Sequence, residues 1–210
     1  MIYLIGGPPK CGKTTLSKKM SRELGIPWIS ADTLQVIARK YMNKKDAVNK
    51  FPWSVIRRKE KSNNDTTYQK YTTKEIIKFS FTQAKATYDA IDMFSICEIE
   101  DGNDYVIEGY QVTPELVSKL CKKYGAEKFK AVFLIKKDTG KFAEDCKKSS
   151  TPNDWILTNT KKPETYIKIA QMVVEFGAFF EKEAQKYGYR VFAMDEDFHG
   201  QLDRIKNYLT

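Results

Sequence analysis

Residues 7–14 read Gly-Pro-Pro-Lys-Cys-Gly-Lys-Thr and match the phosphate-binding pattern G-x-x-x-x-G-K-[S/T] at every fixed position. An apolar run, residues 2–5, precedes them, and Leu16, Met20 and Leu24 follow at helical spacing. The pattern needs this context of strand, loop and helix, because loop amides and the helix N-terminus bind the phosphate together. The glycines let those amides turn inward without a Cβ in the way. This stretch predicts a nucleoside triphosphate site near the start of an α/β fold.

The loop and the start of its helix supply the predicted nucleotide contacts, which are Gly7, Pro8, Pro9, Lys10, Cys11, Gly12, Lys13, Thr14 and Thr15. Lys13 reaches the β- and γ-phosphates and acts in catalysis, while the Thr14 hydroxyl ligates Mg²⁺. We therefore expect ATP and Mg²⁺ as the ligands of this loop. Cys11 lies at the N-terminus of the predicted helix, a position that lowers the pKa of a thiol, so its oxidation could block nucleotide binding. The alternative is that Cys11 is a small residue that the loop tolerates.

Composition bounds the function classes. The 210 residues suit one domain with a small inserted lobe, and 36 Lys+Arg against 27 Asp+Glu give a net charge of +9 that favours acidic partners. Only six of the 36 are arginine, which argues against sequence-specific nucleic-acid binding. Four cysteines without a CxxC, and the single His199, argue against a disulfide framework, a zinc site and a Ser-His-Asp hydrolase. No apolar run is long enough for a membrane span, so we expect a cytoplasmic protein that is a monomer or homodimer.

Strand and helix patterns alternate along the chain. Short apolar runs predict strands at 2–5, 27–30, 105–109, 129–135 and 189–193. Helical periodicity predicts helices at 13–24, 34–41, 73–97, 114–124, 163–187 and near the C-terminus. This alternation predicts an open parallel sheet with right-handed crossovers. Residues 42–99 break the rhythm and indicate a helical insertion, and residues 136–162 are polar and rich in lysine.

Two carboxylates follow predicted strands. Glu108 ends the strand at 105–108, where an acidic residue can hold Mg²⁺ with Thr14; its other interpretation is a helix cap or a salt bridge. Asp32 follows the second strand, where a carboxylate can accept the proton of an attacking hydroxyl. Asp32 could also cap the helix that follows, and the two roles are compatible.

Segments 5–16, 30–34 and 106–110 together resemble small P-loop kinases, the nearest types being 2-phosphoglycerate kinase-like and adenylate kinase-like proteins. Chloramphenicol phosphotransferase and zeta-type kinases are similar around Asp32. The resemblance implies a P-loop NTPase fold with five parallel strands in the order 2-3-1-4-5, flanked by helices. It also implies a single kinase domain, 1–210, with an acceptor-binding insertion at about 42–99 and a mobile lid at about 136–162.

Site residues follow from the same resemblance. Gly109 and Tyr110 match the residues that follow the acidic residue in adenylate kinases, and are assigned with Asp32 to the substrate site. Arg57 and Arg58 are expected to anchor an acidic acceptor, the alternative being a solvated basic stretch. Lid lysines are expected to stabilise the transferring phosphoryl group, namely Lys141 as a catalytic residue with Lys147 and Lys148.

Two departures from nucleotide kinases matter. Gln35 stands where those enzymes carry an arginine for the acceptor phosphate, and residues 136–162 contain no arginine. Both favour a hydroxyl acceptor, because a base such as Asp32 serves an alcohol better than an ionised phosphate. The sequence therefore predicts ATP-dependent transfer of the γ-phosphoryl group to a hydroxyl of a small acidic or phosphorylated metabolite. The alternatives are a nucleoside or nucleotide kinase, and a non-catalytic nucleotide-binding regulator.

Overall fold

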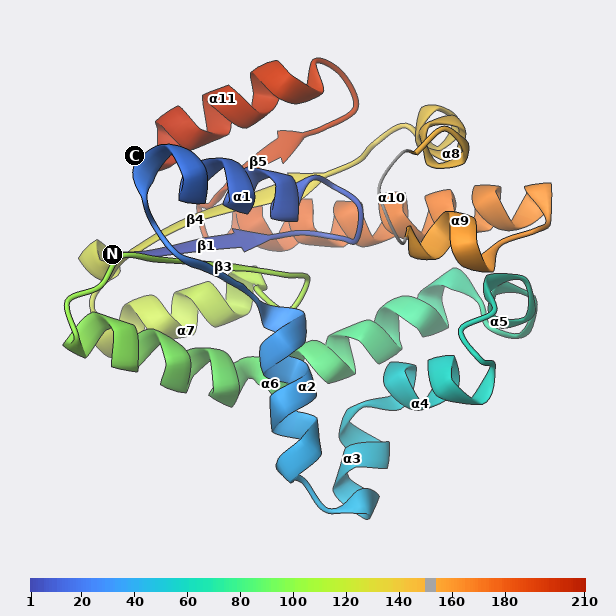
Figure 1. Ribbon diagram of the computed structural model, residues 1–210, viewed down its shortest axis with the longest axis horizontal. Helices are drawn as coiled ribbons and strands as arrows, with labels where there is room; N and C mark the ends of the chain where they lie inside the picture. The colour runs from blue at the N-terminus through green and yellow to red at the C-terminus, as the bar shows by residue number, and fades with distance from the viewer. Residues whose placement is uncertain (150–153) are drawn as a thin grey trace.

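The computed structural model describes residues 1–149 and 154–210. Five parallel strands form one sheet in the order β2-β3-β1-β4-β5, as predicted (Figure 1). The strands are β1 (Ile2–Gly6), β2 (Trp28–Ser30), β3 (Tyr105–Glu108), β4 (Phe129–Ile135) and β5 (Arg190–Ala193). The central strand β1 is buried along its whole length, which explains its unbroken apolar run.

Strand register brings the predicted site residues to one edge of the sheet. Ile5 on β1 pairs with Glu108 on β3, and Ser30 at the end of β2 pairs with Glu108 from the other side. Because the strands are parallel, their carboxyl ends meet here, with the loop after β1 above them. The phosphate-binding loop, Glu108 and the start of the helix after β2 therefore lie together.

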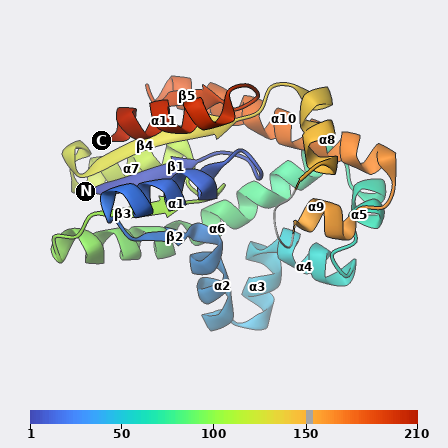
Figure 2. The same ribbon diagram turned by 45° about the horizontal axis from the view of Figure 1, so that its top comes forward.

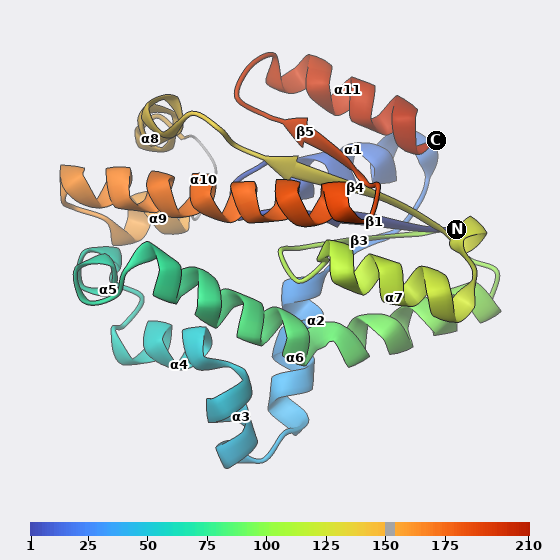
Figure 3. The same ribbon diagram turned by 180° about the vertical axis from the view of Figure 1, so that it is seen from behind.

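Helices cover both faces of the sheet. The face covered by α1 (Lys13–Leu24) and α11 (Phe198–Leu209) is seen in Figure 1. Figure 3 shows the opposite face, with α7 (Pro114–Tyr124) and α10 (Pro163–Lys186) in front of it. A short 3-10 turn, Ala126–Lys128, joins α7 to β4. On α10, the ring of Phe180 packs 5.8 Å from that of Phe133 on β4.

The predicted insertion is helical throughout. It consists of α3 (Lys44–Lys50), α4 (Pro52–Lys59), α5 (Asn64–Lys70) and α6 (Thr73–Glu100), and follows α2 (Ala31–Tyr41). A capping box of Thr72 and Glu75 starts α6, which packs against α2, α4, α10 and the central strand. Thus α6 also belongs to the layer that covers the sheet, whereas α2 and α3 project from it (Figure 2).

In the segment predicted as a lid, the residues that the structure describes form two helices. They are α8 (Thr139–Lys147), which packs on α10, and α9 (Trp155–Asn159), which contacts α5 and α8. The lid residues 150–153 lie outside the described part of the chain. None of the helices described is both long and apolar enough to cross a bilayer.

Candidate active site

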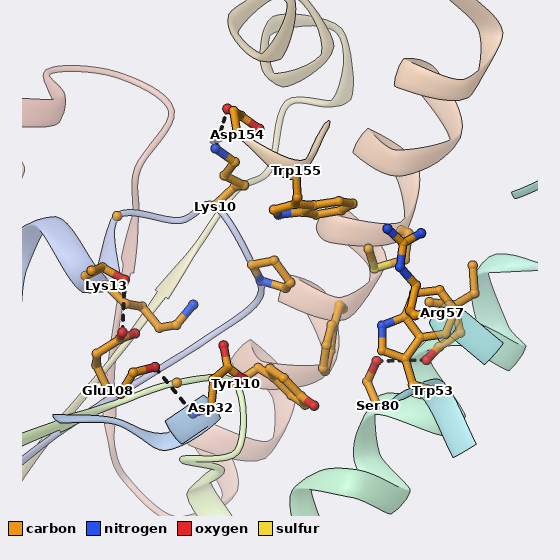
Figure 4. Close-up of a pocket in the computed structure, with 18 of the residues that line it drawn as sticks. Lys10, Lys13, Asp32, Trp53, Arg57, Ser80, Glu108, Tyr110, Asp154 and Trp155 are labelled. Atoms are coloured by element: carbon orange, nitrogen blue, oxygen red, sulfur yellow. Dashed lines mark hydrogen bonds and ion pairs between the residues drawn. The ribbon is translucent and has the colours of Figure 1, made fainter. Parts of the chain in front are cut away.

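A cleft of about 1100 Å³ opens at the carboxyl edge of the sheet. The phosphate-binding loop and the ends of β2 and β3 line one part of it, and α4, α5, α6 and α9 line the other. Figure 4 shows Lys13, Glu108 and Asp32 near the loop, and Arg57 and Trp53 on the insertion. The cleft therefore joins the predicted nucleotide site to the predicted acceptor site.

The phosphate-binding loop has the backbone that its sequence demands. Gly7 has φ +126°, and a Cβ there would lie 2.0 Å from the carbonyl oxygen of Leu134. Gly12 has φ +91° just before α1, a conformation that glycine adopts without strain. Lys13 is buried, and its Nζ donates to the Pro8 carbonyl oxygen at 2.6 Å. Phosphate oxygens can replace that carbonyl, so Lys13 is already directed into its own loop.

Thr14 and Glu108 meet beside the loop. The Thr14 hydroxyl donates to Glu108 Oε1 at 2.9 Å. Burial raises the pKa of Glu108, while the charge of Lys13 and the hydrogen bond from Thr14 act in the opposite direction. A hydroxyl and a carboxylate are oxygen ligands of the kind that Mg²⁺ prefers. No cluster of three or more acidic, Cys or His ligands occurs in 1–149 or 154–210, so phosphate and water oxygens would have to complete the coordination.

Asp32 faces the same cleft from the first turn of α2. Ser30, not Asp32, caps this helix, since the Ser30 hydroxyl accepts the Asp32 amide at 3.3 Å. The Asp32 side chain is thus available for other partners, and Oδ1 accepts from Gln111 Nε2 at 2.7 Å. Within the described residues Oδ2 has no protein donor. An unengaged, ionisable oxygen at the mouth of a phosphate site is what a general base requires.

Gly109 and Tyr110, which the resemblance assigns to the substrate site, line the cleft, but the tyrosine hydroxyl is engaged within the protein. It donates to Gln35 Oε1 and accepts from Gln83 Nε2, each at 2.9 Å. Burial and the nearby Asp32 charge raise its pKa, so Tyr110 stays protonated. The contacts of Gln111 and Gln83 cannot be predicted from the sequence, because buried amides leave no periodic or motif signal.

Arg57 lies close to two tryptophan rings. The centroids of Trp53 and Trp155 are 5.7 Å and 5.8 Å from its guanidinium carbon. Its donors reach Asn64 Oδ1 at 2.7 Å and the Ser62 carbonyl at 2.6 Å, and burial lowers its pKa. Among the ion pairs of the described chain, none gives Arg57 a carboxylate. Arg57 is therefore a positioned cation whose charge is not balanced by the protein.

Two further residues of the predicted acceptor region differ in their surroundings. Arg58 is exposed to solvent and lines the cleft. Tyr68 on α5 is buried and also lines the cleft, and none of the residues that the structure describes gives its hydroxyl a hydrogen-bond partner. A buried hydroxyl without a partner is costly, and it indicates a place where a ligand oxygen can bind.

An ion pair joins the phosphate-binding loop to α9. Lys10 Nζ lies 2.5 Å from Asp154 Oδ2, and Asp154 Oδ1 caps α9 by accepting the Ile156 amide at 2.9 Å. The ring of the next residue, Trp155, lies 5.8 Å from the guanidinium carbon of Arg57. Adjacent residues of one short helix therefore contact both parts of the cleft.

The predicted lid lysines do not line the cleft. Lys141 is exposed on α8 and lies 3.6 Å from Asp145, and Lys147 pairs with Glu144 at 2.8 Å. The buried face of α8, formed by Phe142, Ala143 and Cys146, packs toward α10 and turns the lysines to solvent. The lysines that do line the cleft are Lys10, Lys13 and the buried Lys136, whose Nζ donates to the Met194 carbonyl.

The expectation of a low thiol pKa at Cys11 is wrong. The side chain is fully buried, and its Sγ lies 3.6 Å from the Pro9 carbonyl oxygen. Burial raises the pKa to about 12 and outweighs the nearby charges of Lys13 and Lys136. Desolvation of the thiolate here exceeds the effect of the helix N-terminus, so Cys11 is a packing residue.

No protein-family model and no curated protein sequence matches this chain. Among solved structures, shikimate kinase from Bacteroides thetaiotaomicron is similar, with a TM-score of 0.51, 16% identity, and coverage of 100% of this chain and 98% of that one. An uncharacterized protein from Eubacterium ventriosum ATCC 27560 gives a TM-score of 0.50 and 12% identity, with coverage of 100% and 97%. Together with the strand order, these likenesses show that the chain has the small P-loop kinase fold.

Proposed function

We propose that this protein transfers the γ-phosphoryl group of ATP to a hydroxyl of a small acidic metabolite. The observation that carries the proposal is the position of Asp32, in the same cleft as Lys13 and the Thr14–Glu108 pair and with Oδ2 unengaged. A carboxylate at that place can take the proton that an alcohol loses as its oxygen attacks phosphorus. The fold itself serves many functions, so the proposal rests on these residues.

Each residue near the loop has a distinct part in this reaction. Lys13 exchanges the Pro8 carbonyl for phosphate oxygens and offsets their developing negative charge. The loop amides and the N-terminus of α1 hold the same phosphates in place. Thr14 and Glu108 are the residues that would hold Mg²⁺. When bound, the ion would neutralise part of the negative charge of the phosphates. Asp32 orients the acceptor hydroxyl and receives its proton.

The acceptor site is proposed to lie in the part of the cleft lined by the insertion helices within 42–99. Arg57 offers a partly buried cation beside two tryptophan rings, and the Tyr68 hydroxyl has no partner among the described residues and can donate to a ligand. A carboxylate or phosphate on the acceptor matches both groups. Arg58, exposed at the lining, is a weaker anchor because its charge is solvated.

The structure of the Gln35 site disfavours a nucleoside monophosphate kinase. Gln35 is buried, and its Oε1 accepts from both Tyr110 and Gln111. Its side chain carries no charge, so it lacks the cation with which an arginine would hold an acceptor phosphate. The other alternative, a non-catalytic regulator, differs from both kinases because it would bind ATP without hydrolysing it or transferring its phosphoryl group.

ADP release from Mg-ATP in the presence of pooled metabolites tests the proposal. We expect acceptor-dependent ADP with the wild type, and loss of it with both Lys13→Ala and Asp32→Asn. Splitting the pool then identifies the acceptor. Full transfer by Asp32→Asn would remove the assigned base, and ATP binding without acceptor-dependent ADP would favour the regulator.

A further inference from the structure

Gln111 is a fully buried amide in the turn after β3. Its Nε2 donates to Asp32 Oδ1 at 2.7 Å and to Gln35 Oε1 at 3.1 Å. Both partners are oxygens that can only accept, so the opposite orientation of the amide would bring three oxygens together without a proton. The side chain is thus fixed with its nitrogen toward Asp32.

The oxygen of the same Gln111 amide destabilises the folded protein. Gln111 Oε1 is buried and, within 1–149 and 154–210, has no hydrogen-bond partner. A methionine of similar length would fill the space without leaving a buried oxygen unpaired. The chain keeps an amide here for what its nitrogen does, which is to hold Asp32 and Gln35.

A chain of hydrogen bonds continues from Gln35 to the insertion. The Tyr110 hydroxyl donates to Gln35 Oε1 and accepts from Gln83 Nε2, both at 2.9 Å. Gln83 Oε1 in turn accepts the backbone amide of Ser54 at 2.5 Å. Ser54 lies on α4, one helical turn before Arg57. Neutral, buried groups therefore connect the carboxylate at the sheet edge to the helix that carries the proposed acceptor anchor.

We propose that Gln111 is a positioning residue for Asp32. By holding Oδ1, it leaves Oδ2 for the proton of the acceptor hydroxyl, and the amide chain fixes this arrangement relative to α4. The inference rests on the proposed function, because it takes Asp32 to be the base. Gln111 contacts no reacting atom and acts only through the carboxylate that it holds.

Removing the Gln111 donor frees the Asp32 carboxylate. Asp32 is exposed on the first turn of α2, so its side chain can then adopt other staggered rotamers, with water on both oxygens. Asp32 Oδ2 then spends less of the time in the position from which it can accept the proton of the acceptor hydroxyl. Misplacement of a catalytic group by about 1 Å can lower the rate about 100-fold. We expect kcat to fall about 10- to 100-fold with the KM for ATP within about twofold, since the phosphate loop is untouched.

A double-mutant cycle tests this role. The rate of ADP formation at saturating Mg-ATP is compared between Gln111→Met, Asp32→Asn and the double variant. The acceptor is the metabolite pool that the wild type uses; if the wild type uses none of these metabolites, water serves as the acceptor and the assay measures ATP hydrolysis. Gln111→Asn keeps an amide but shortens its reach to Asp32. It serves as a second test in case the methionine variant does not fold. Gln185→Met, at an exposed position on α10, is the matched control and should match the wild type.

The cycle should be strongly non-additive. In the Asp32→Asn background we expect Gln111→Met to lower kcat by less than about twofold, because its effect passes through the missing carboxylate. Losses that multiply, or a Gln111→Met enzyme with wild-type kcat, would overturn the positioning role alone. An Asp32→Asn enzyme with full activity would instead refute the proposed base, and the positioning role with it.

Discussion

Neutralising Asp154 is predicted to strengthen ATP binding. In the free protein Asp154 holds Lys10 of the phosphate-binding loop, with Nζ and Oδ2 only 2.5 Å apart. Phosphate oxygens entering the loop compete with that carboxylate for Lys10. Asp154→Asn removes the competitor and keeps an oxygen for the Ile156 amide, because asparagine caps helices as well as aspartate.

The size of the effect follows from the surroundings of the pair. The Lys10 side chain is 21% exposed and that of Asp154 2%, so the interaction is only partly screened by water. Hydrogen bonds to charged groups contribute about 1.5–3 kcal/mol. Recovering about half of the upper value, about 1.5 kcal/mol, predicts that the Kd for ATP is about tenfold lower in Asp154→Asn.

Isothermal titration with a non-hydrolysable ATP analogue and Mg²⁺ measures this change. Glu144→Gln is the matched control, since it makes the same charge change on the neighbouring α8 and breaks an exposed pair with Lys147. We expect that control within about twofold of the wild type. An unchanged or weakened Kd in Asp154→Asn would show that Asp154 aids Lys10 rather than competing for it.

Three further predictions concern stability and reactivity. Since burial raises the pKa of Glu108, its ionisation opposes folding, so Glu108→Gln should raise the Tm of the nucleotide-free protein at pH 7, with the gain vanishing below about pH 4. Alkylation followed by peptide mass spectrometry should label exposed Cys97 quickly and Cys11 only after unfolding; equal rates would contradict the burial of Cys11. In urea melts, Gly7→Ala should lose more than about 3 kcal/mol, because its Cβ meets a carbonyl, whereas Gly25→Ala, with open space, should lose about 1 kcal/mol.

The phosphate loop and the strands could be predicted from the sequence because local patterns encode them, whereas the order of the strands followed from the resemblance to small P-loop kinases. The loop needs glycines at fixed positions, and β1 is buried along its length, so both leave a direct trace in the residues. The sequence also placed Asp32 and Glu108 at strand ends, and parallel register brings such ends together. Local chemistry and topology were sufficient for these features.

Features that depend on packing could not be predicted in this way. Lys141 was assigned to the lid by residue type, but the packing of α8 decides which face its lysines occupy. The thiol pKa of Cys11 depends on burial that no motif reveals. The contacts of Gln111 with Asp32 and Gln35 join residues 79 and 76 positions apart, and only the folded chain brings them together.

Phosphorus NMR of the reaction tests the central claim most directly. Wild-type protein, Mg-ATP and the metabolite pool should convert the γ-phosphate resonance into that of a phosphomonoester, in step with ADP, and Asp32→Asn should form neither product at a comparable rate. A γ-phosphate signal that remains in ATP, or that appears only as inorganic phosphate with every acceptor supplied, would contradict transfer to a hydroxyl.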